Sequence, residues 1–212
     1  MLHRQRYEDY LVTIYRLEEA LGEAKTSDIA RELKVSPATV SKVIRQLESK
    51  GLVKREKYHY VKLIGRGRKI AELVVRKHRI AEVFLSNILG FNELDSHSYA
   101  HYLEHLPDVV IEKLYAYTNY PQYCPHGNDI PSSSSGDVRL SRLSQVLEGE
   151  TCSVVKIAGE FIGILEYLYK EGIKPGVQLA VVERRDQGIL VSFGSSTQEI
   201  PNYVARFIYV KC

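Results

Sequence analysis

Histidines and glutamates in the middle third of the chain have the spacing of metal ligands. His78 and Glu82 are four residues apart, so both side chains lie on one face of a predicted helix. His101, Glu104 and His105 are three and four residues apart on the next predicted helix and share a face in the same way. An imidazole one turn away from a carboxylate suits a divalent first-row metal ion. Two such clusters on successive helices favour a metal site over a chance grouping of polar residues.

The same spacing could serve catalysis, and the zinc-protease helix is the nearest comparison. That motif needs a glutamate directly after the first of two histidines spaced four apart. Here Tyr102 follows His101 and Glu104 precedes His105, so the positioned general base is missing. We also find no glycine-rich phosphate loop and no nucleophile elbow. We therefore expect a binding protein rather than an enzyme, with a metallohydrolase that carries a further domain as an open alternative.

Cys124 and His126 form another possible metal pair, in the run Cys-Pro-His-Gly. Proline and glycine at these positions already suit a turn. A turn without metal is therefore the favoured interpretation of this run.

Apolar periodicity predicts the elements that must position these residues. The first helix includes residues 7–21 and stops at Gly22, and a short helix follows over 27–33. Ser36 is a good N-cap and Pro37 suits a first helical turn, so the next helix begins there and ends at Gly51. The remaining expectations are strands at 52–56 and 60–64 and helices at 67–89, 96–106 and 107–117.

The two short helices and the following hairpin form a predicted winged helix-turn-helix. The second helix would lie in the major groove of DNA, where small and hydroxylated residues at its start allow close approach to base edges. The hairpin would act as a basic wing that contacts phosphates. The candidate DNA-binding residues are Ser36, Pro37, Ala38, Thr39, Ser41, Lys42, Arg45, Lys57, Tyr58 and His59.

The distribution of charge supports an anionic partner for this region. Residues 1–79 hold 19 Lys and Arg against 10 Asp and Glu, a balance of +9, whereas the rest of the chain has a balance of −6. Such asymmetry between parts of a chain points to nucleic acid, although a solvated basic surface is the simpler alternative.

Composition sets the compartment that we expect. Hydrophobic residues make up 44% and charged residues 26%, as in a soluble globular protein, and no apolar run is long enough to span a bilayer. The N-terminus lacks the apolar core of a signal peptide, so we expect a cytoplasmic protein without membrane contact. Three widely spaced cysteines, Cys124, Cys152 and Cys212, make a disulfide framework unexpected in such a compartment.

The second half of the chain contains two regions that differ in composition. Residues 119–137 contain three prolines, two glycines and four consecutive serines, which predicts a linker or long loop. Short apolar strands with turn signals then predict a small β-barrel. The expected fold is mainly α with a small β domain. Its parts are a winged helix-turn-helix (1–72), a helical metal-binding and dimerisation domain (73–120), a linker (121–138) and the barrel (139–212).

The chain resembles the diphtheria toxin repressor family, whose members are iron- and manganese-dependent repressors, over nearly its whole length. The resemblance is carried by EDYLVTIYRLEE, SDIARELKVSPATVSKVIRQLESKGLV, IGRGRKIAELVVRKHRIAEVFLSNILG and HYLEHLP. The tail, with GIKPGVQLAVVERRDQGILVSFG, is similar to the iron-transport accessory protein FeoA.

This resemblance implies two metal sites at the junction of the DNA-binding and dimerisation regions. One site falls on three residues of the helical domain, and the barrel adds the nearest acid: His78, Glu82, His97 and Glu160. The other, regulatory site falls on Asp9, His101, Glu104 and His105.

The regulatory site departs from both branches of the family. Asp9 and His101 stand where the iron branch has methionine and cysteine. The manganese branch shares the aspartate but has glutamates at the positions of Val12 and His101. Fe²⁺, Mn²⁺ and Zn²⁺ all suit the resulting mixture of oxygen and nitrogen ligands, and the barrel tail favours Fe²⁺.

The resemblance further implies a homodimer that represses metal-homeostasis genes from a palindromic double-stranded DNA operator, with no small-molecule substrate. Metal would join Asp9 on the first helix to the later cluster and so hold the two recognition helices about one DNA turn apart. A metal-independent winged-helix regulator that senses a small molecule or redox state remains the alternative.

Overall fold

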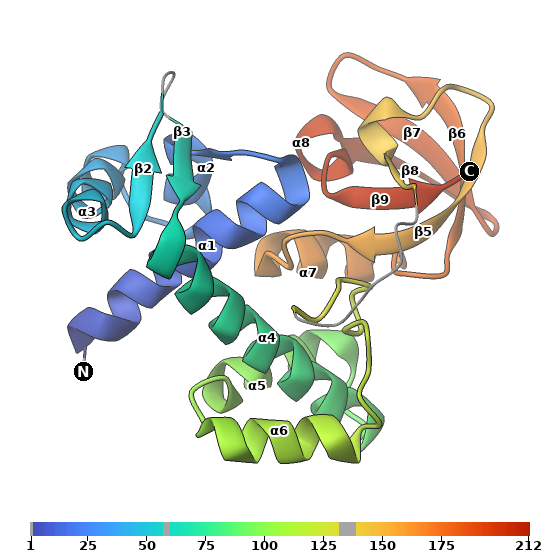
Figure 1. Ribbon diagram of the computed structural model, residues 1–212. Coiled ribbons are helices and arrows are strands. Elements are labelled where there is room, and N and C mark those ends of the chain that lie inside the picture. Colours follow the sequence, from blue (N-terminus) through green and yellow to red (C-terminus); the bar gives the residue numbers. More distant parts are fainter. Residues whose placement is uncertain (1, 57–59, 132–138) are drawn as a thin grey trace.

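The computed structural model describes residues 2–56, 60–131 and 139–212, and the backbone alone for residues 2–6 (Figure 1). The N-terminal part contains three helices and a three-stranded sheet in the order β1-β3-β2. Its elements are α1 (Leu2–Leu21), β1 (Ala24–Lys25), α2 (Thr26–Glu32), α3 (Pro37–Ser49), β2 (Val53–Arg55) and β3 (Tyr60–Leu63). The predicted helix-turn-helix and hairpin are confirmed, whereas β1 gave no signal in the sequence. The wing-tip residues Lys57, Tyr58 and His59 lie outside the described part.

Helix α3 begins where the sequence predicts. The Thr39 backbone N–H donates to Ser36 Oγ over 3.1 Å, and Pro37 occupies the first turn. Such a cap contributes about 1 kcal/mol to helix stability. Val40 and Ile44 on the inner face are fully buried, which holds the helix on the core and leaves its other face exposed.

Three helices form the middle part, α4 (Gly65–Asn87), α5 (Glu93–Leu103) and α6 (Asp108–Tyr117). Helix α5 begins and ends about three residues earlier than predicted. Asn92 accepts a hydrogen bond from the Asp95 N–H over 2.9 Å and caps the helix, a start signal that apolar periodicity does not contain. Glu104 is therefore the C-cap and His105 lies in the following turn, so the prediction that both lie within this helix is wrong.

The segment after α6 was expected to be a linker or long loop, and its described part is a loop that is largely buried. Residues 121–131 are irregular, with a β-bridge between Tyr123 and Asp129. Cys124, His126 and Asn128 are all buried there. The segment thus packs against the interior of the protein, and its buried polar side chains need hydrogen-bond partners.

The C-terminal part is a six-stranded antiparallel sheet in the order β4-β9-β5-β6-β7-β8. The edge strands β4 and β8 are not paired with each other in the described residues, so the expected barrel is an open, FeoA-like sheet. Its elements are β4 (Ser141–Arg142), β5 (Thr151–Ile157), α7 (Ile162–Lys170), β6 (Gln178–Arg184), β7 (Gly188–Phe193), β8 (Ser196–Pro201), α8 (Asn202–Ala205) and β9 (Ile208–Lys211).

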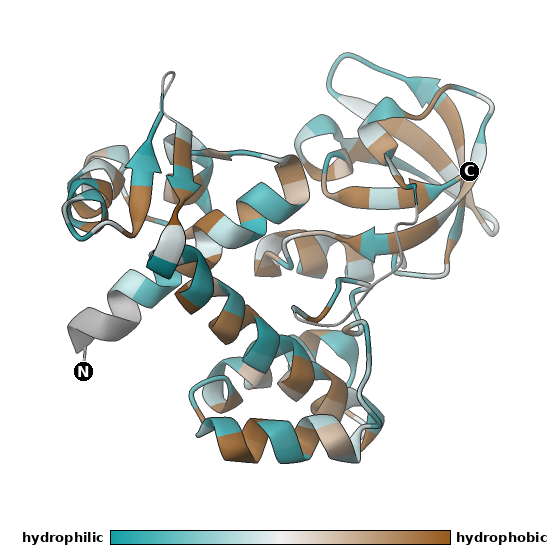
Figure 2. Ribbon diagram, in the orientation of Figure 1, coloured by the Kyte–Doolittle hydropathy of each residue, from teal (hydrophilic) through white to brown (hydrophobic). Residues whose placement is uncertain are grey.

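The sheet domain packs directly on the DNA-binding part, and buried apolar residues of the two form one continuous core. Tyr209 donates a hydrogen bond to the Ala20 carbonyl over 2.7 Å, and Arg206 pairs with Asp28 at 2.9 Å. The strands are largely hydrophobic, whereas α6, at the lower edge of Figure 2, alternates hydrophobic and polar residues. No helix in the described ranges is long and apolar enough to cross a membrane.

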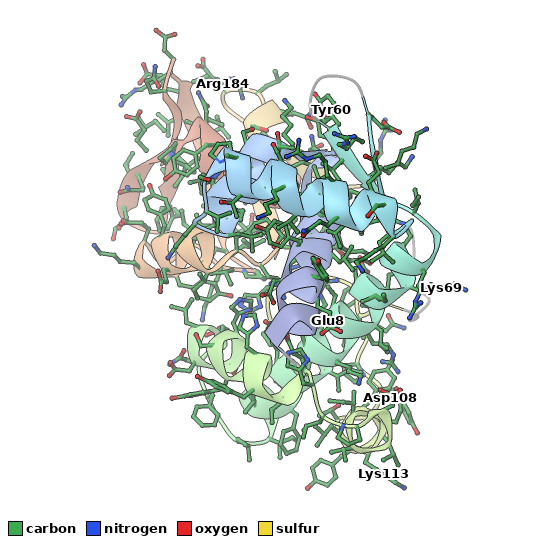
Figure 3. The ribbon with its side chains drawn as sticks, turned by 90° about the vertical axis from the view of Figure 1, so that its left-hand side faces the viewer. Glu8, Tyr60, Lys69, Asp108, Lys113 and Arg184 are labelled. Atoms are coloured by element: carbon green, nitrogen blue, oxygen red, sulfur yellow. A yellow bond between two sulfur atoms is a disulfide. The ribbon has the colours of Figure 1, made fainter. Side chains whose placement is uncertain are left out.

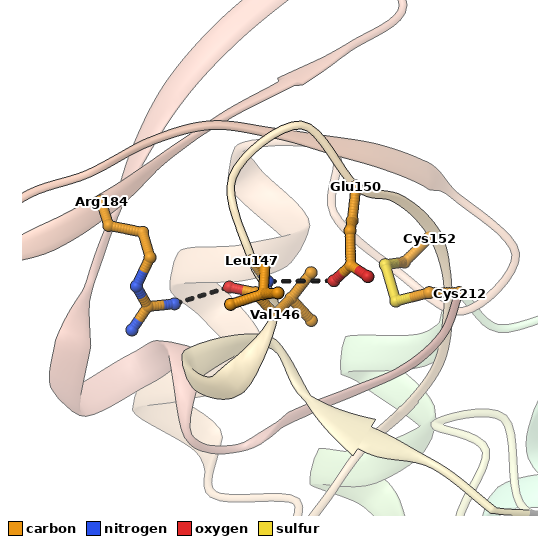
Figure 4. Close-up of a disulfide and its surroundings, with 6 residues drawn as sticks. All are labelled: Val146, Leu147, Glu150, Cys152, Arg184 and Cys212. Atoms are coloured by element: carbon orange, nitrogen blue, oxygen red, sulfur yellow. Dashed lines mark hydrogen bonds between the residues drawn. A yellow bond between two sulfur atoms is a disulfide. The ribbon is translucent and has the colours of Figure 1, made fainter.

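Cys152 and Cys212 form a disulfide, so the expectation of unpaired cysteines is wrong for this pair (Figure 4). The two residues are 60 positions apart, but the pairing of Ser153 with Lys211 between β5 and β9 makes them neighbours. Sequence spacing alone does not reveal such a pairing. Cys124 remains a buried free thiol.

Thiol counting should reproduce this pairing. Protein unfolded without reductant should react with iodoacetamide at Cys124 only, whereas prior reduction should expose all three cysteines. Intact-mass spectrometry counts the added groups. Alkylation of all three cysteines without reductant would contradict the disulfide.

Candidate metal centre

Helices α4 and α5 bring together the three helical residues of the first predicted site. Glu82 Oε1 lies 3.1 Å from His78 Nε2 and 2.6 Å from His97 Nδ1. The two histidine nitrogens are themselves 3.1 Å apart. All three side chains are almost completely buried, so their polar atoms depend on one another for partners.

Two residues that sequence reasoning had assigned to a turn complete this centre. One potential ligand atom each from Glu82, Cys124, His126 and Glu160 lie within 4.8 Å of one another, and all four residues are buried. His126 Nδ1 is 3.4 Å from Glu82 Oε1, and the Cys124 thiol donates to Glu160 Oε1 over 2.9 Å. The Cys-Pro-His-Gly run was the signal available in the sequence.

The local backbone explains how these residues reach the interior. Gly127 has φ +81°, and a Cβ there would lie 2.2 Å from the Val155 carbonyl oxygen, so only glycine allows this turn to press against β5. Glu160 has φ +51°, a conformation that costs a non-glycine residue about 1 kcal/mol or more. Its side chain thereby enters the centre.

Arginine side chains balance part of the negative charge. The buried Arg79 donates to Glu160 Oε1 over 2.9 Å and to Glu19 Oε1 over 2.8 Å. Burial raises the pKa of Glu160, but the charges of Arg79, Arg16 and His126 together reverse that effect and lower it to about 2. Burial likewise opposes ionisation of Glu82, and the neighbouring His126 and His78 reverse that effect and hold its pKa well below the usual range. Both carboxylates are therefore charged.

The buried donors fit a divalent cation. Glu82 Oε2, His126 Nε2 and Glu160 Oε2 have no hydrogen-bond partner among the described residues, although all three atoms are inaccessible to solvent. Burial lowers the pKa of His97 to about 4, so its imidazole is neutral and free to donate a lone pair. Carboxylate oxygens, imidazoles and a thiol together are typical ligands of Fe²⁺, Zn²⁺ and related ions.

The residues of the second predicted site gather beside the first. Glu104 is 3.4 Å from His101 Nδ1 and 3.6 Å from His105 Nε2. Glu104 also accepts from His78 Nδ1 at 2.7 Å, so His78 connects the two clusters. Asp9 lines one cavity together with His101, Glu104 and His105. The pKa of the Asp9 carboxyl is raised by burial and by the charge of Glu104. The clusters are contiguous rather than separate, which the linear spacing did not indicate.

The predicted DNA-reading residues occupy the outer face of α3. Thr39 is half-buried, and the other six described residues are exposed: Ser36, Pro37, Ala38, Ser41, Lys42 and Arg45. Figure 3 shows α3 toward the viewer, with Asp108 and Lys113 of α6 at the opposite end of the molecule.

Comparison with known proteins agrees with this layout. Three family models match successive ranges: the N-terminal DNA-binding domain of iron-dependent repressors (3–61), their metal-binding and dimerisation domain (65–132) and the FeoA domain (141–212). The solved structure of the manganese regulator SloR is 31% identical, with a TM-score of 0.80 over 97% of each chain. The chain belongs to the diphtheria toxin repressor family. Members are DNA-binding repressors rather than enzymes, as expected.

Other relatives are named for regulation by iron. The iron-dependent repressor IdeR of Mycobacterium leprae (strain TN) is 29% identical over 96% of both chains. The solved structure of T. acidophilum IdeR is 29% identical, with a TM-score of 0.80 over 96% of both chains. Iron and manganese regulators are thus similarly close to the chain, so similarity alone does not choose the metal.

Replacement of His126 should distinguish metal binding at the buried cluster (Glu82, Cys124, His126 and Glu160) from metal binding at the second cluster around Glu104. His126→Gln should weaken Zn²⁺ binding at the buried cluster by about tenfold or more, because it removes a ligand while retaining a polar side chain. The matched variant His105→Gln changes only the second cluster and should leave the buried-site affinity unchanged. Competition with a chromophoric chelator measures both, and equal effects of the two variants would contradict this division.

Metal affinity should rise with pH. Burial, followed by the charges of Glu160 and Glu82, raises the pKa of the Cys124 thiol well above its usual value, so the metal-free repressor retains this proton at neutral pH. Binding through sulfur releases the proton, and the association constant should grow by about tenfold per pH unit. Zn²⁺ titrations one pH unit apart check the slope. A slope that Cys124→Ser leaves unchanged would exclude the thiol as the source.

Proposed function

We propose that this repressor is a cytoplasmic homodimer that binds a palindromic operator when a divalent metal, Fe²⁺ foremost, occupies the buried cluster and the cluster around Glu104. The observation that carries the proposal is the set of buried, unpartnered donor atoms on Glu82, His126 and Glu160. A buried polar atom without a partner is costly, and one potential ligand atom of each of these residues lies within 4.8 Å of the others, close enough for a single cation to bind them.

The ligands come from different parts of the chain. Glu82 lies on α4, His126 in the segment after α6, and Glu160 at the entrance to α7 in the sheet domain. A bound divalent cation supplies positive charge and coordination bonds at this meeting point. Asp9 on α1 and His101 on α5 face the same cavity and would tie the DNA-binding part to the helical part.

This linkage would act on DNA binding through geometry. The recognition helices of a dimer must lie about 34–36 Å apart to enter successive major grooves on one face of DNA. Holding α1 against α5 restricts the orientation of the helix-turn-helix relative to the dimer, so metal would raise the population that fits an operator. The basic side chains of Lys42 and Arg45, exposed on α3, would add attraction to DNA phosphates without changing this selection.

The dimer contact would use α6. Val109 and Tyr117 are 67% and 70% exposed, whereas Ile111 of the same helix is buried against α4. An apolar face of this kind, on the part of the chain that matches a dimerisation domain, suits a second copy.

The ligand set supports Fe²⁺ more than Mn²⁺. Thiol and imidazole ligands suit Fe²⁺ and Zn²⁺, whereas Mn²⁺ prefers an all-oxygen environment. Cys124 and His126 at the buried cluster therefore favour Fe²⁺ or Zn²⁺ over Mn²⁺, and the FeoA-like tail adds support for Fe²⁺.

A DNA-shift titration at fixed salt tests the function. Upstream fragments of genomic DNA should form specific complexes with Fe²⁺ under anaerobic conditions, and with Mn²⁺ or Zn²⁺ in an order that ranks the metals. A chelator should abolish these complexes. Specific binding that survives the chelator would instead establish a metal-independent winged-helix regulator.

Two substitutions should separate metal sensing from DNA contact. Glu104→Gln should remove the metal-dependent gain while retaining weak, non-specific binding, because Glu104 contacts His78, His101 and His105. Arg45→Ala should weaken binding of every sequence if Arg45 contacts phosphate. Glu166→Gln, an exposed glutamate on α7, is the matched control and should behave as wild type. Unchanged metal-dependent affinity of Glu104→Gln would refute the proposed mechanism.

A further inference from the structure

Arg16 on α1 is a buried cation with incomplete partners. The residue is 6% exposed, and neither Nε nor Nη2 has a hydrogen-bond partner in the described part of the chain. Glu160 is the acid beside it, but its Oε2 lies 3.7 Å from Nη2, beyond hydrogen-bond distance. A buried guanidinium in this state calls for an acceptor.

Arg16 lines a cavity of about 460 Å³ between α1, the end of α5 and the start of α7. The first turn of α7 forms part of the opposite wall, through Ile162 and Gly163. No side chain caps this nine-residue helix. Ile164 and Leu165 donate their N–H groups to the Phe161 carbonyl, which leaves the N–H groups of Ile162 and Gly163 without intrahelical acceptors.

Buried arginine and a helix N-terminus are both donors to anions. The helix end carries partial positive charge, and its free N–H groups bind carboxylate or phosphate oxygens. Arg16 adds charge-assisted hydrogen bonds of the kind that carboxylates accept. The two features face one cavity from different domains, so a single anion could engage both.

The acids that line the cavity already have partners. Glu160 binds Arg79, Glu32 binds Arg31 at 3.0 Å, and Glu104 binds His78. Glu8 is also engaged, and Asp9 lies in the electrostatic field of His101 and His105. Arg16 is therefore the cavity cation whose hydrogen bonds an added anion would complete.

The walls select the chemical class of the anion. Apolar side chains line much of the cavity, among them Val12, Leu33, Val74 and Ile164. An added Cβ at Gly163 would meet nothing within 4 Å, so space is open beside the helix end. A carboxylate with a short hydrocarbon tail satisfies both the donors and these walls, whereas phosphate satisfies only the donors.

We propose that this cavity binds a small organic carboxylate, held by Arg16 and the N-terminus of α7. Asp9, His101, Glu104 and His105 line the same cavity, but neither Arg16 nor the start of α7 is among the candidate metal ligands. The occupant would connect α1 of the DNA-binding part to α7 of the sheet domain. The proposal does not depend on metal binding, so it can be tested on metal-free protein.

Calorimetric titration of the metal-free, full-length protein with isobutyrate tests the site. One saturable site per chain is expected, and Arg16→Gln should weaken it by about tenfold or more, as loss of a charge-assisted hydrogen bond implies. Arg31→Gln is the matched control, since Arg31 lines the same cavity but is exposed and pairs with Asp28. It should change the affinity less than about threefold.

Gly163→Leu provides a second variant that leaves Arg16 intact. The added side chain should fill the open space and abolish isobutyrate binding. Leucine has a higher helix propensity than glycine, so we expect no loss of stability. This variant decides the case if Arg16→Gln fails to fold. Absence of saturable isobutyrate binding to the wild type, or saturable binding of inorganic phosphate alone, would overturn the carboxylate assignment. Retention of isobutyrate binding by Gly163→Leu would place the ligand elsewhere.

Discussion

The burial of two carboxylates at one point constrains the arrangement of the whole molecule. Glu82 and Glu160 are both completely buried where the helical part meets the sheet domain. Transfer of each charge from water costs several kcal/mol unless partners compensate it. Those partners come from separate segments: His78 and Arg79 from α4, His97 from α5, and His126 from the segment after α6. The segments must therefore stay together for the charges to remain buried.

This constraint gives the sheet domain a physical role. Its residue Glu160 reaches the centre through a strained backbone conformation, and Arg79 holds the carboxylate in place. The same domain shares a continuous apolar core with α1 and pairs Arg206 with Asp28 of α2. The domain that carries Glu160 is thus joined to the DNA-binding part by direct contacts.

Local signals in the sequence predicted much of this architecture. Ser36 and Pro37 marked the start of the recognition helix, and the spacing of His78 and Glu82 marked a shared helix face. The features that were missed depend on contacts between residues that are far apart in the sequence. Cys124 and His126 looked like turn residues because their burial depends on β5, which is distant in sequence. The end of α5 before Glu104 and the pairing of Cys152 with Cys212 likewise depend on contacts that periodicity does not encode.

Cobalt(II) titration of the oxidised, full-length protein tests the central claim, that a divalent metal binds at the buried cluster, most directly. Cysteine thiolate bound to Co²⁺ gives an intense charge-transfer absorption in the near ultraviolet, and Cys124 is the free thiol available to produce it. The account predicts that this band saturates at one ion per chain and disappears in Cys124→Ser. Absence of the band from the wild type, or its persistence in Cys124→Ser, would contradict metal binding at this centre.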